Sequence, residues 1–145
     1  MIKNIKKSES GRSMVEMLAV LAIIGVLSIG GIAGYVIAMD RWRANEVLDL
    51  ASKLHVIAMS KNEGQGGDAD VRDLNVSLDK VAGGAIDWIY ADDPQWNNGE
   101  ARIHVGLKPA NERVGKAIKS IAGDMVEQNA GNDYEMTIIF EEYED

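Results

Sequence analysis

The feature that most constrains this chain is an uncharged segment of 23 residues, 17–39, which reads MLAVLAIIGVLSIGGIAGYVIAM. A bilayer core about 30 Å thick is crossed by ~20 apolar residues in a helix, so this segment is long enough to span a membrane. The residues after it are polar: 40–145 carry 11 Lys or Arg and 21 Asp or Glu, a net charge of −10. A chain of 145 residues therefore predicts a membrane-spanning helix followed by one small polar domain.

The charges that flank the segment predict its orientation. Basic residues precede it, at Lys3, Lys6, Lys7 and Arg12. Arg41 and Arg43 follow it, next to Asp40. Because the side richer in Lys and Arg favours the cytoplasm, we expect a cytoplasmic N-terminus and an acidic domain outside the cytoplasm. Tyr35 and Trp42 are expected at the outer interface, where amphipathic aromatic rings are favoured.

A secretory signal that is cleaved off is the alternative interpretation of this segment. Such signals have an apolar region of about 7 to 15 residues, which is shorter than the segment found here. Ala33, preceded by Gly31, offers small residues of the kind found at their cleavage sites, and cleavage there would release a chain that begins at Gly34.

The composition excludes several kinds of chemistry. The chain has no cysteine, so it has no disulfide, thiolate nucleophile or zinc–thiolate site. Its pI near 4.7 argues against nucleic acid as a partner, because phosphate contacts need a basic surface. The histidines, His55 and His104, show no catalytic or metal-binding spacing, and His55 is expected to be a partly buried structural residue. We therefore expect neither an enzyme nor a bound cofactor.

One carboxylate lies at the start of the apolar segment. Glu16 follows Met14 and Val15 and precedes the uncharged run. Insertion scales place an acid at the centre of a membrane helix at roughly 2.5–3.5 kcal/mol, so a charged residue in such a helix indicates a function. The alternative is an interfacial carboxylate that reaches the lipid headgroups, because the penalty falls near the helix end.

The residues around this carboxylate form a longer pattern. Glu16 is the fifth residue after Gly11, AIIGVLS follows at 22–28, and the apolar helix ends near Tyr35. From Gly11 to Tyr35, without a gap, the pattern resembles the class III signal of type IV pilins and pseudopilins. The resemblance implies that a membrane prepilin peptidase cuts between Gly11 and Arg12 and usually methylates the new N-terminus. It divides the chain into a leader, 1–11, and a mature protein, 12–145.

The resemblance also implies a role for the carboxylate. In this family the acid pairs with the new N-terminal amine of a neighbouring subunit, which here places Glu16 against the amine of Arg12. Removing one partner of a buried pair costs about 3–5 kcal/mol. Since Arg12 and Glu16 are four residues apart, the Arg12 side chain of the same helix is a second group that can neutralise the acid. Arg12 departs from the family pattern, in which Phe is common as the first mature residue.

A second departure lies within the apolar helix. Many relatives have Pro two residues before the closing Tyr, where this chain has Ala33 between Gly30, Gly31 and Gly34. Each glycine lowers helix propensity by about 1 kcal/mol relative to alanine, so the glycines can soften the helix locally. Gly30 and Gly34 also form a GxxxG pattern, which permits close helix packing in membranes. The alternative is that small residues are simply common in such helices.

The resemblance implies a structural subunit of a type IV pilus or related filament. Its partners would be identical or related pilin subunits, the prepilin peptidase, the inner-membrane assembly platform and the lipid bilayer. It would be a single-pass protein of the bacterial inner membrane and then part of a cell-surface or periplasmic filament. A pseudopilin of a type II secretion system is the first alternative. A membrane-anchored extracytoplasmic binding domain that never polymerises is the second.

Apolar residues continue at helical spacing beyond the membrane segment, at Val47, Leu50, Ala51, Leu54, Ile57 and Ala58. A cluster of helix breakers follows at 63–67, which predicts a helix over 13–62 that is roughly 75 Å long at 1.5 Å per residue. Period-two alternation predicts antiparallel strands at 86–90, 101–107 and 136–140, the first two joined by the turn-rich loop 92–100. Before the last strand an apolar stripe predicts a further helix, at Val114, Ile118, Ile121 and Met125. A short helical piece is expected near 71–81.

The predicted fold class is α+β and pilin-like. A long N-terminal helix, which spans the membrane in its first half, packs on a small antiparallel sheet with one further helix. Residues 12–39 form the membrane and assembly half of the helix. The globular domain covers 40–145 and includes the outer half of the helix, about 40–62. A helix between the last two strands is similar to the arrangement in type IVb-like pilins.

Acidic residues in two loops raise the question of calcium, because some pseudopilins use a calcium site in place of a disulfide. Asp68, Asp70 and Asp73 offer carboxylate oxygens in one loop, and Asp92 and Asp93 in another. Neither group has EF-hand spacing, so solvated loops are the favoured interpretation, and no metal is expected. The acidic C-terminal residues, 141–145, are expected to be solvated.

Overall fold

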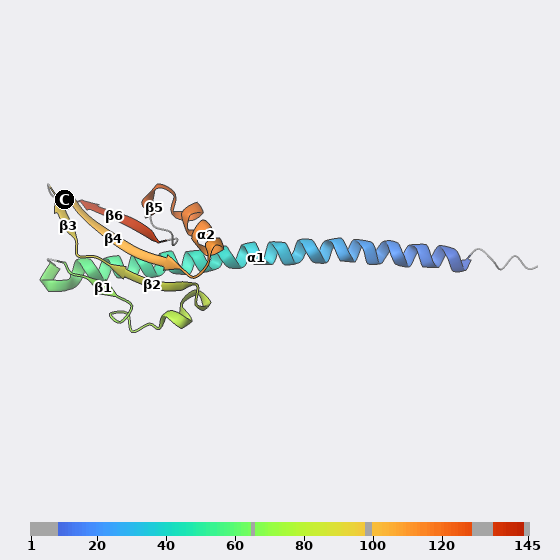
Figure 1. The fold of residues 1–145 in the computed structure, drawn as a ribbon, viewed down its shortest axis with the longest axis horizontal. Coiled ribbons are helices and arrows are strands. Elements are labelled where there is room, and N and C mark those ends of the chain that lie inside the picture. Colours follow the sequence, from blue (N-terminus) through green and yellow to red (C-terminus); the bar gives the residue numbers. More distant parts are fainter. Residues whose placement is uncertain (1–8, 65, 98–99, 129–134, 144–145) are drawn as a thin grey trace, which may run out of the picture. The chain divides into compact units, whose positions relative to one another are not determined.

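The computed structural model describes residues 9–64, 66–97, 100–128 and 135–143 (Figure 1). Side chains are described for 13–61, 66–96, 101–127 and 135–141. The chain forms two compact units, 1–38 and 39–145. The described part of the first unit is the N-terminal part of one helix, and the second unit contains the rest of that helix and the strands that the structure describes.

The helix α1 (Glu9–Gly64) is continuous, and the prediction of a helix over 13–62 is confirmed. It ends at the predicted cluster of breakers. The N–H of Gly66 donates to the carbonyl oxygen of Lys61 at 2.9 Å, and that of Gly67 donates to the carbonyl oxygen of Ala58 at the same distance. Gly66 has a φ of +94°, a left-handed conformation that residues with a side chain rarely adopt, so glycine is needed where the chain leaves the helix.

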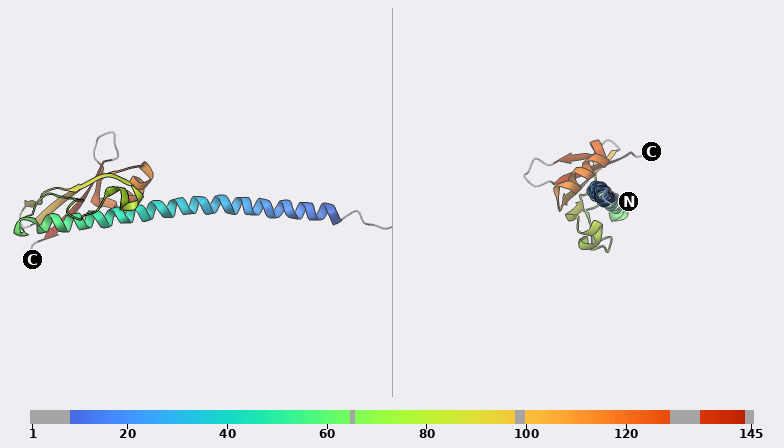
Figure 2. Two further views of the ribbon diagram at one scale, coloured as in Figure 1. Left: turned by 90° about the horizontal axis from the view of Figure 1, so that it is seen from below. Right: turned by 90° about the vertical axis from the view of Figure 1, so that its right-hand side faces the viewer.

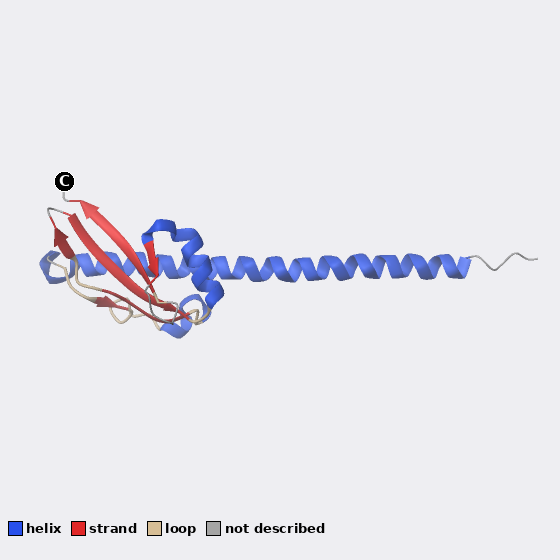
Figure 3. Cartoon of the chain, turned by 45° about the horizontal axis from the view of Figure 1, so that its top comes forward, coloured by secondary structure: helices blue, strands red, loops and turns tan. Residues whose placement is uncertain are grey.

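The strands form one antiparallel sheet in the second unit. Its order is β1-β2-β4-β6-β5, with β3 also paired to β4. The strands are β1 (Ala69–Asp70), β2 (Ile86–Ala91), β3 (Gln95–Asn97), β4 (Glu100–Pro109), β5 (Val126–Gln128) and β6 (Met136–Tyr143). The three predicted strands are β2, β4 and β6, and in Figure 3 the long strands β4 and β6 lie side by side.

The core of the second unit lies between the sheet and the outer half of α1. On the helix the fully enclosed residues recur every three or four positions, at Ala44, Val47, Ala51, Leu54 and Ala58. On the sheet they alternate along β4, at Ala101, Ile103, Val105 and Leu107, as the period of two predicts. In the left view of Figure 2 the strands lie along the green part of α1 that carries this stripe. A helix packed on a small antiparallel sheet is therefore confirmed.

Strand β2 differs from its predicted alternation. Between Ile86 and Trp88 the pairing with β4 shifts by one residue, which is a β-bulge that changes the face of every later side chain. Ile89 is therefore buried, whereas the ring of Trp88 stacks on that of Tyr90 outside the core, with centroids 5.3 Å apart. The prediction that Ile86, Trp88 and Tyr90 share one face is wrong for this reason.

The further helix α2 (Glu112–Ala122) begins as predicted and ends early. The side chain of Asn111 caps it by accepting a hydrogen bond from the N–H of Val114 at 3.1 Å. At its C-terminus Gly123 has a φ of +59°, and a short 3₁₀ turn, η2 (Gly123–Met125), follows. Of the predicted stripe, Val114 and Ile118 are buried, but Ile121 and Met125 are 44% and 46% exposed.

The remaining differences concern short elements. The helical piece expected at 71–81 is instead a turn followed by the 3₁₀ helix η1 (Leu78–Gly83), whose backbone leaves helical geometry at Val81 and Ala82. The loop expected at 92–100 contains β3, which pairs with the start of β4. Strands of two or three residues are too short to show a period of two, so β1, β3 and β5 escape this kind of prediction.

Candidate functional site

The first unit presents an apolar surface that no other described residue covers. Its large side chains from Met14 to Ile37 are mostly more than half exposed, from 52% at Ile24 to 72% at Ile29. The helix is long and apolar enough to cross a membrane by length and composition. A continuous apolar surface of this size is not stable in water, so it requires lipid or protein around it. This exposed surface is the first component of the site.

Glu16 lies on this same surface. Its side chain is exposed, and no ion pair or hydrogen bond joins it to another of the described side chains. It is the only charged residue of the span 13–39. A carboxylate without a partner in apolar surroundings requires neutralisation from outside the described chain, by a cation, a proton or the membrane interface.

The predicted cleavage point lies in helical backbone. The peptide bond between Gly11 and Arg12 belongs to the first turn of α1, which begins at Glu9. The side chain of Arg12 lies outside the described residues. The first N–H groups of a helix lack intrahelical acceptors, and helix ends fray, so this turn unwinds more readily than the interior of α1. A peptidase that needs an extended substrate would meet the least resistance here.

The glycines of the apolar helix are not needed for packing inside the chain. Among the described residues, a Cβ atom built on Gly30, Gly31 or Gly34 would meet no atom within 4 Å beyond the adjoining residues and the nearby backbone of the same helix. Gly30 and Gly34 lie on one face of α1 because they are four residues apart. Their roles in helix softening or in close packing stay predictions, and a close-packed neighbour would have to come from another molecule.

Aromatic and charged residues follow the apolar surface. Tyr35 is 66% exposed and Trp42 is 53% exposed. One turn of charged residues lies beside Trp42: Arg43 Nη1 is 3.8 Å from Asp40 Oδ1 in an ion pair between neighbouring turns. Exposed aromatic rings next to charged residues are typical of helices at a membrane–water interface, and the placement of Tyr35 and Trp42 at the outer interface stays a prediction.

The acidic loop that raised the question of calcium contains a cation of the protein itself. Lys61 Nζ donates to the carbonyl oxygen of Asp68 at 2.6 Å and to Asp73 Oδ2 at 2.8 Å. Asp73 Oδ2 also accepts from the N–H of Asp70, and Asp70 Oδ1 accepts from the N–H of Arg72. Among the described residues no three acidic or histidine side chains are grouped so that they could hold a metal ion. The ammonium of Lys61 is the positive charge that Asp73 and the carbonyl of Asp68 contact in this loop.

Two aspartates in this loop region have shifted pKa values. The hydrogen bond from Lys61, followed by that from the backbone of Asp70, holds the pKa of Asp73 below its ordinary value of 3.8. Burial, with a smaller contribution from Asp68, raises the pKa of Asp92 above 3.8, against the opposing effect of His104. The sequence did not predict that Lys61 and Asp92 belong with this loop. The signal available was a lysine in the last turn of a helix before the breakers.

The two histidines lie in different environments, one buried and one exposed. His55 is 8% exposed, and its ring stacks on that of Phe140 with centroids 4.6 Å apart, so it is buried more fully than the partly buried position that was predicted. His104 is exposed on the opposite face of the sheet, paired with Ile139. The structure does not bring the two imidazoles together.

Comparisons of this chain with protein-family models, with curated proteins and with solved structures found no match.

Proposed function

We propose that this protein is a structural subunit of a type IV pilus or pilus-like filament. The observation that carries the proposal is the uncovered apolar surface of α1, with Glu16 as its single charge, five residues after Gly11. Such a surface inserts into a bilayer as a single helix and packs against like helices once it leaves the lipid. The resemblance of 11–35 to the pilin signal supports the same reading.

The carboxylate provides the selection step in this proposal. While the leader is attached, its lysines hold the N-terminus at the cytoplasmic face. Cleavage before Arg12 removes them and creates an α-amine. An incoming subunit whose amine reaches Glu16 of a neighbour replaces an unpaired acid by an ion pair, and leaving one partner unpaired in a buried pair costs about 3–5 kcal/mol. Subunits out of register lack this contact, so the pair fixes the register.

The outer half of α1 and the sheet supply the rest of a filament subunit. They form a compact polar unit with its own core. The residues that fold this unit are therefore different from those that would pack the N-terminal helices of neighbouring subunits together. The first alternative is a pseudopilin of a type II secretion system, and the same features support it equally. The second alternative is a binding domain that never polymerises. Glu16 distinguishes this alternative from a filament subunit, because a helix that serves only as a membrane anchor needs no acid within its apolar segment.

The first experiment is co-expression with a prepilin peptidase, followed by intact mass measurement. The expected product begins at Arg12, with or without a methyl group. A product that begins at Gly34 would instead identify a secretory signal. A chain that keeps residues 1–11 in the presence of an active peptidase would overturn the proposal.

The second experiment separates the two ways of neutralising the acid. Subunit crosslinking in membranes is expected to be lost in Glu16→Ala and kept in Ser28→Ala, an exposed control on the same helix whose hydroxyl only donates to the carbonyl oxygen of Ile24. Arg12→Ala keeps the α-amine and removes the guanidinium. Crosslinking in that variant supports the amine as the partner of Glu16, and its loss assigns the role to the Arg12 side chain. Normal crosslinking in Glu16→Ala would contradict assembly through this residue.

A further inference from the structure

The helix α2 is a basic surface on an acidic unit. Residues 40–145 contain 11 Lys or Arg and 21 Asp or Glu, of which α2 holds three cations and one acid. The helix is therefore +2, and the rest of these residues are −12. Its cations, Arg113, Lys116 and Lys119, are exposed and recur every three residues, which places them opposite the buried Val114 and Ile118. Positive charge is thus concentrated on the outer face of one helix.

Two of the three cations have no counter-ion within the part of the chain that the structure describes. Lys116 Nζ is 2.6 Å from Glu112 Oε1, in an exposed ion pair one turn apart. No described side chain forms an ion pair with Arg113 or Lys119. The guanidinium and the second ammonium are therefore the charges that attract an anion from outside the unit.

The helix α2 lies at the end of the second unit that contains the first residues of its part of α1. In one depression Val81 of η1 lies beside Glu46 and Leu50 of α1. The N–H of Ala110 donates to the carbonyl oxygen of Ala85 at 2.9 Å, which holds the start of α2 next to the end of η1. Figures 1 and 2 show the orange helix α2 beside the cyan part of α1. The basic helix therefore lies near the residues that follow the apolar segment.

These residues are close to the expected surface of a bilayer. Glu46 is seven residues after Met39, the last residue of the uncharged segment, which is about 10 Å along the helix. The headgroup layer of a bilayer is itself about 5–7 Å thick on each side. Trp42, which is 53% exposed, is a residue of the kind found in this layer. A membrane crossed by 17–39 thus brings its headgroups within reach of the long side chains of α2.

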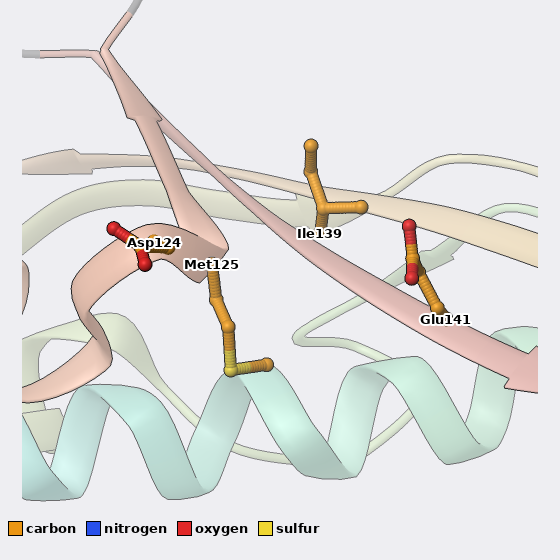
Figure 4. Close-up of a pocket in the computed structure, with 4 residues that line it drawn as sticks. All are labelled: Asp124, Met125, Ile139 and Glu141. Atoms are coloured by element: carbon orange, nitrogen blue, oxygen red, sulfur yellow. The ribbon is translucent and has the colours of Figure 1, made fainter.

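The residues after α2 limit the attraction to the helix itself. Figure 4 shows the depression that follows it, lined by Asp124, Met125, Ile139 and Glu141. Met125 and Ile139 point to opposite sides of β6, so they form no joint apolar surface, and the other two lining residues are acids. An anionic surface is attracted at α2 and repelled at this depression, which favours one orientation of the unit.

A second copy of the chain is the other source of negative charge. Its acidic loops, at 68–73 and 92–93, lie toward the other end of the sheet from α2. Gln95 pairs with Arg102, which is about 23 Å along β4 from Pro109, the last residue of the strand before α2. Two copies anchored in one membrane point the same way, so they hold these loops at one height and α2 at another. Lipid is therefore the anion that α2 meets first.

We propose that α2 docks the second unit on the membrane that α1 spans, with Arg113 and Lys119 bound to phosphate groups of anionic lipids. The contact holds the folded unit against the bilayer in one orientation while the chain is a single membrane protein. It rests on the part of the proposed function in which α1 crosses a bilayer, and it does not require polymerisation. One basic residue near an anionic surface corresponds to about a fivefold gain, so the two together raise the ratio of docked to undocked units about 25-fold.

The full chain reconstituted in lipid vesicles tests the docking. Because the chain has no cysteine, one fluorophore can be attached at Ser120→Cys on α2, or at Gln95→Cys as an exposed control toward the far end of the sheet. Lipids with a nitroxide on the headgroup quench a fluorophore that lies at the bilayer surface. We expect strong quenching at position 120 in vesicles rich in phosphatidylglycerol. Little quenching is expected there in pure phosphatidylcholine, or at position 95 in either lipid.

Charge variants locate the contact. Arg113→Gln combined with Lys119→Gln is expected to lower the ratio of docked to undocked units about 25-fold in vesicles rich in phosphatidylglycerol. Arg72→Gln combined with Arg102→Gln makes the same change of net charge at exposed positions away from α2, and is expected to leave the ratio unchanged. High salt should release the unit, because it screens charges that are exposed to solvent.

Other outcomes contradict this proposal. Equal quenching at position 120 in neutral and anionic vesicles means that lipid charge does not hold the unit. An equal loss in the control variant assigns the attraction to net charge alone. Energy transfer between labelled copies, without quenching by the lipids, assigns α2 to the acidic loops of a second copy. A chain that alkaline extraction removes from the vesicles overturns this inference and the proposed function together, whereas an inserted chain without quenching overturns this inference alone.

Discussion

Replacing Leu54 by alanine tests whether the outer half of α1 is part of the folded core of the second unit. Leu54 is 0% exposed and belongs to the largest fully buried side chains. Its neighbours on the same helix face, Ala51 and Ala58, are small and cannot extend into the space that the substitution leaves. Buried Leu→Ala substitutions cost about 2–5 kcal/mol, and poor refilling of the cavity places this one in the upper part of that range.

The measurement is urea unfolding of the full chain in detergent micelles, followed by tryptophan fluorescence. Trp88 lies in the sheet, so it reports on the second unit. We expect Leu54→Ala to lower the free energy of unfolding by about 3–5 kcal/mol with an unchanged slope against urea. Domains of this size are stable by about 5–15 kcal/mol in total, so the change is a large fraction of the stability.

A matched control lies half a turn away on the same helix. Val56 is 60% exposed, and Val56→Ala is expected to change stability by less than about 0.5 kcal/mol. If Leu54→Ala lowers stability by less than about 1 kcal/mol, or if the two variants are equal, the helix stripe is not the core of this unit and the reasoning from its spacing fails.

Two further predictions concern the region where α1 ends. A Cβ atom on Gly66, whose φ is +94°, would lie 2.5 Å from Pro94 Cγ, so Gly66→Ala is expected to lower the free energy of unfolding by more than about 2 kcal/mol. Gly83 has a φ of +63° but open space around it, so Gly83→Ala is expected to lower it by only about 1 kcal/mol. Thermal melts of the two variants measure the difference. Because Lys61 lowers the pKa of Asp73 in the folded state, their contact stabilises the protein above pH 3.8, and this contribution is lost as the pH falls through the lowered pKa. Melts of Lys61→Met against pH should show a smaller loss of stability between pH 4 and strong acid than the parent, and identical pH profiles would contradict this assignment.

The sequence predicts the long elements of this fold and misses the short ones, for a physical reason. The helix α1 and strands β4 and β6 repeat their apolar residues over several periods, so local spacing decides their structure. One bulge after Ile86 is enough to reverse the faces of β2, because the side-chain period of a strand is two. Strand β5 is formed by its pairing with β6, the next strand along the chain, and nothing within its three residues indicates this.

The same contrast holds for the sites. The roles of Gly11 and Glu16 can be predicted from the sequence because the signal that they resemble is a local pattern along a single helix. The contact between Lys61 and Asp73 depends on where the chain turns at Gly66, so it joins groups that a linear reading treats separately.

The ammonium of Lys61 has a consequence for the surroundings in which this protein can fold. A loop closed by a dissolved divalent ion depends on the supply of that ion and opens when a chelator removes it. Here the charge that closes the loop is covalently part of the chain and cannot be washed out. The contact therefore does not depend on the supply of a divalent ion, and acidity, which protonates Asp73, is the condition that weakens it.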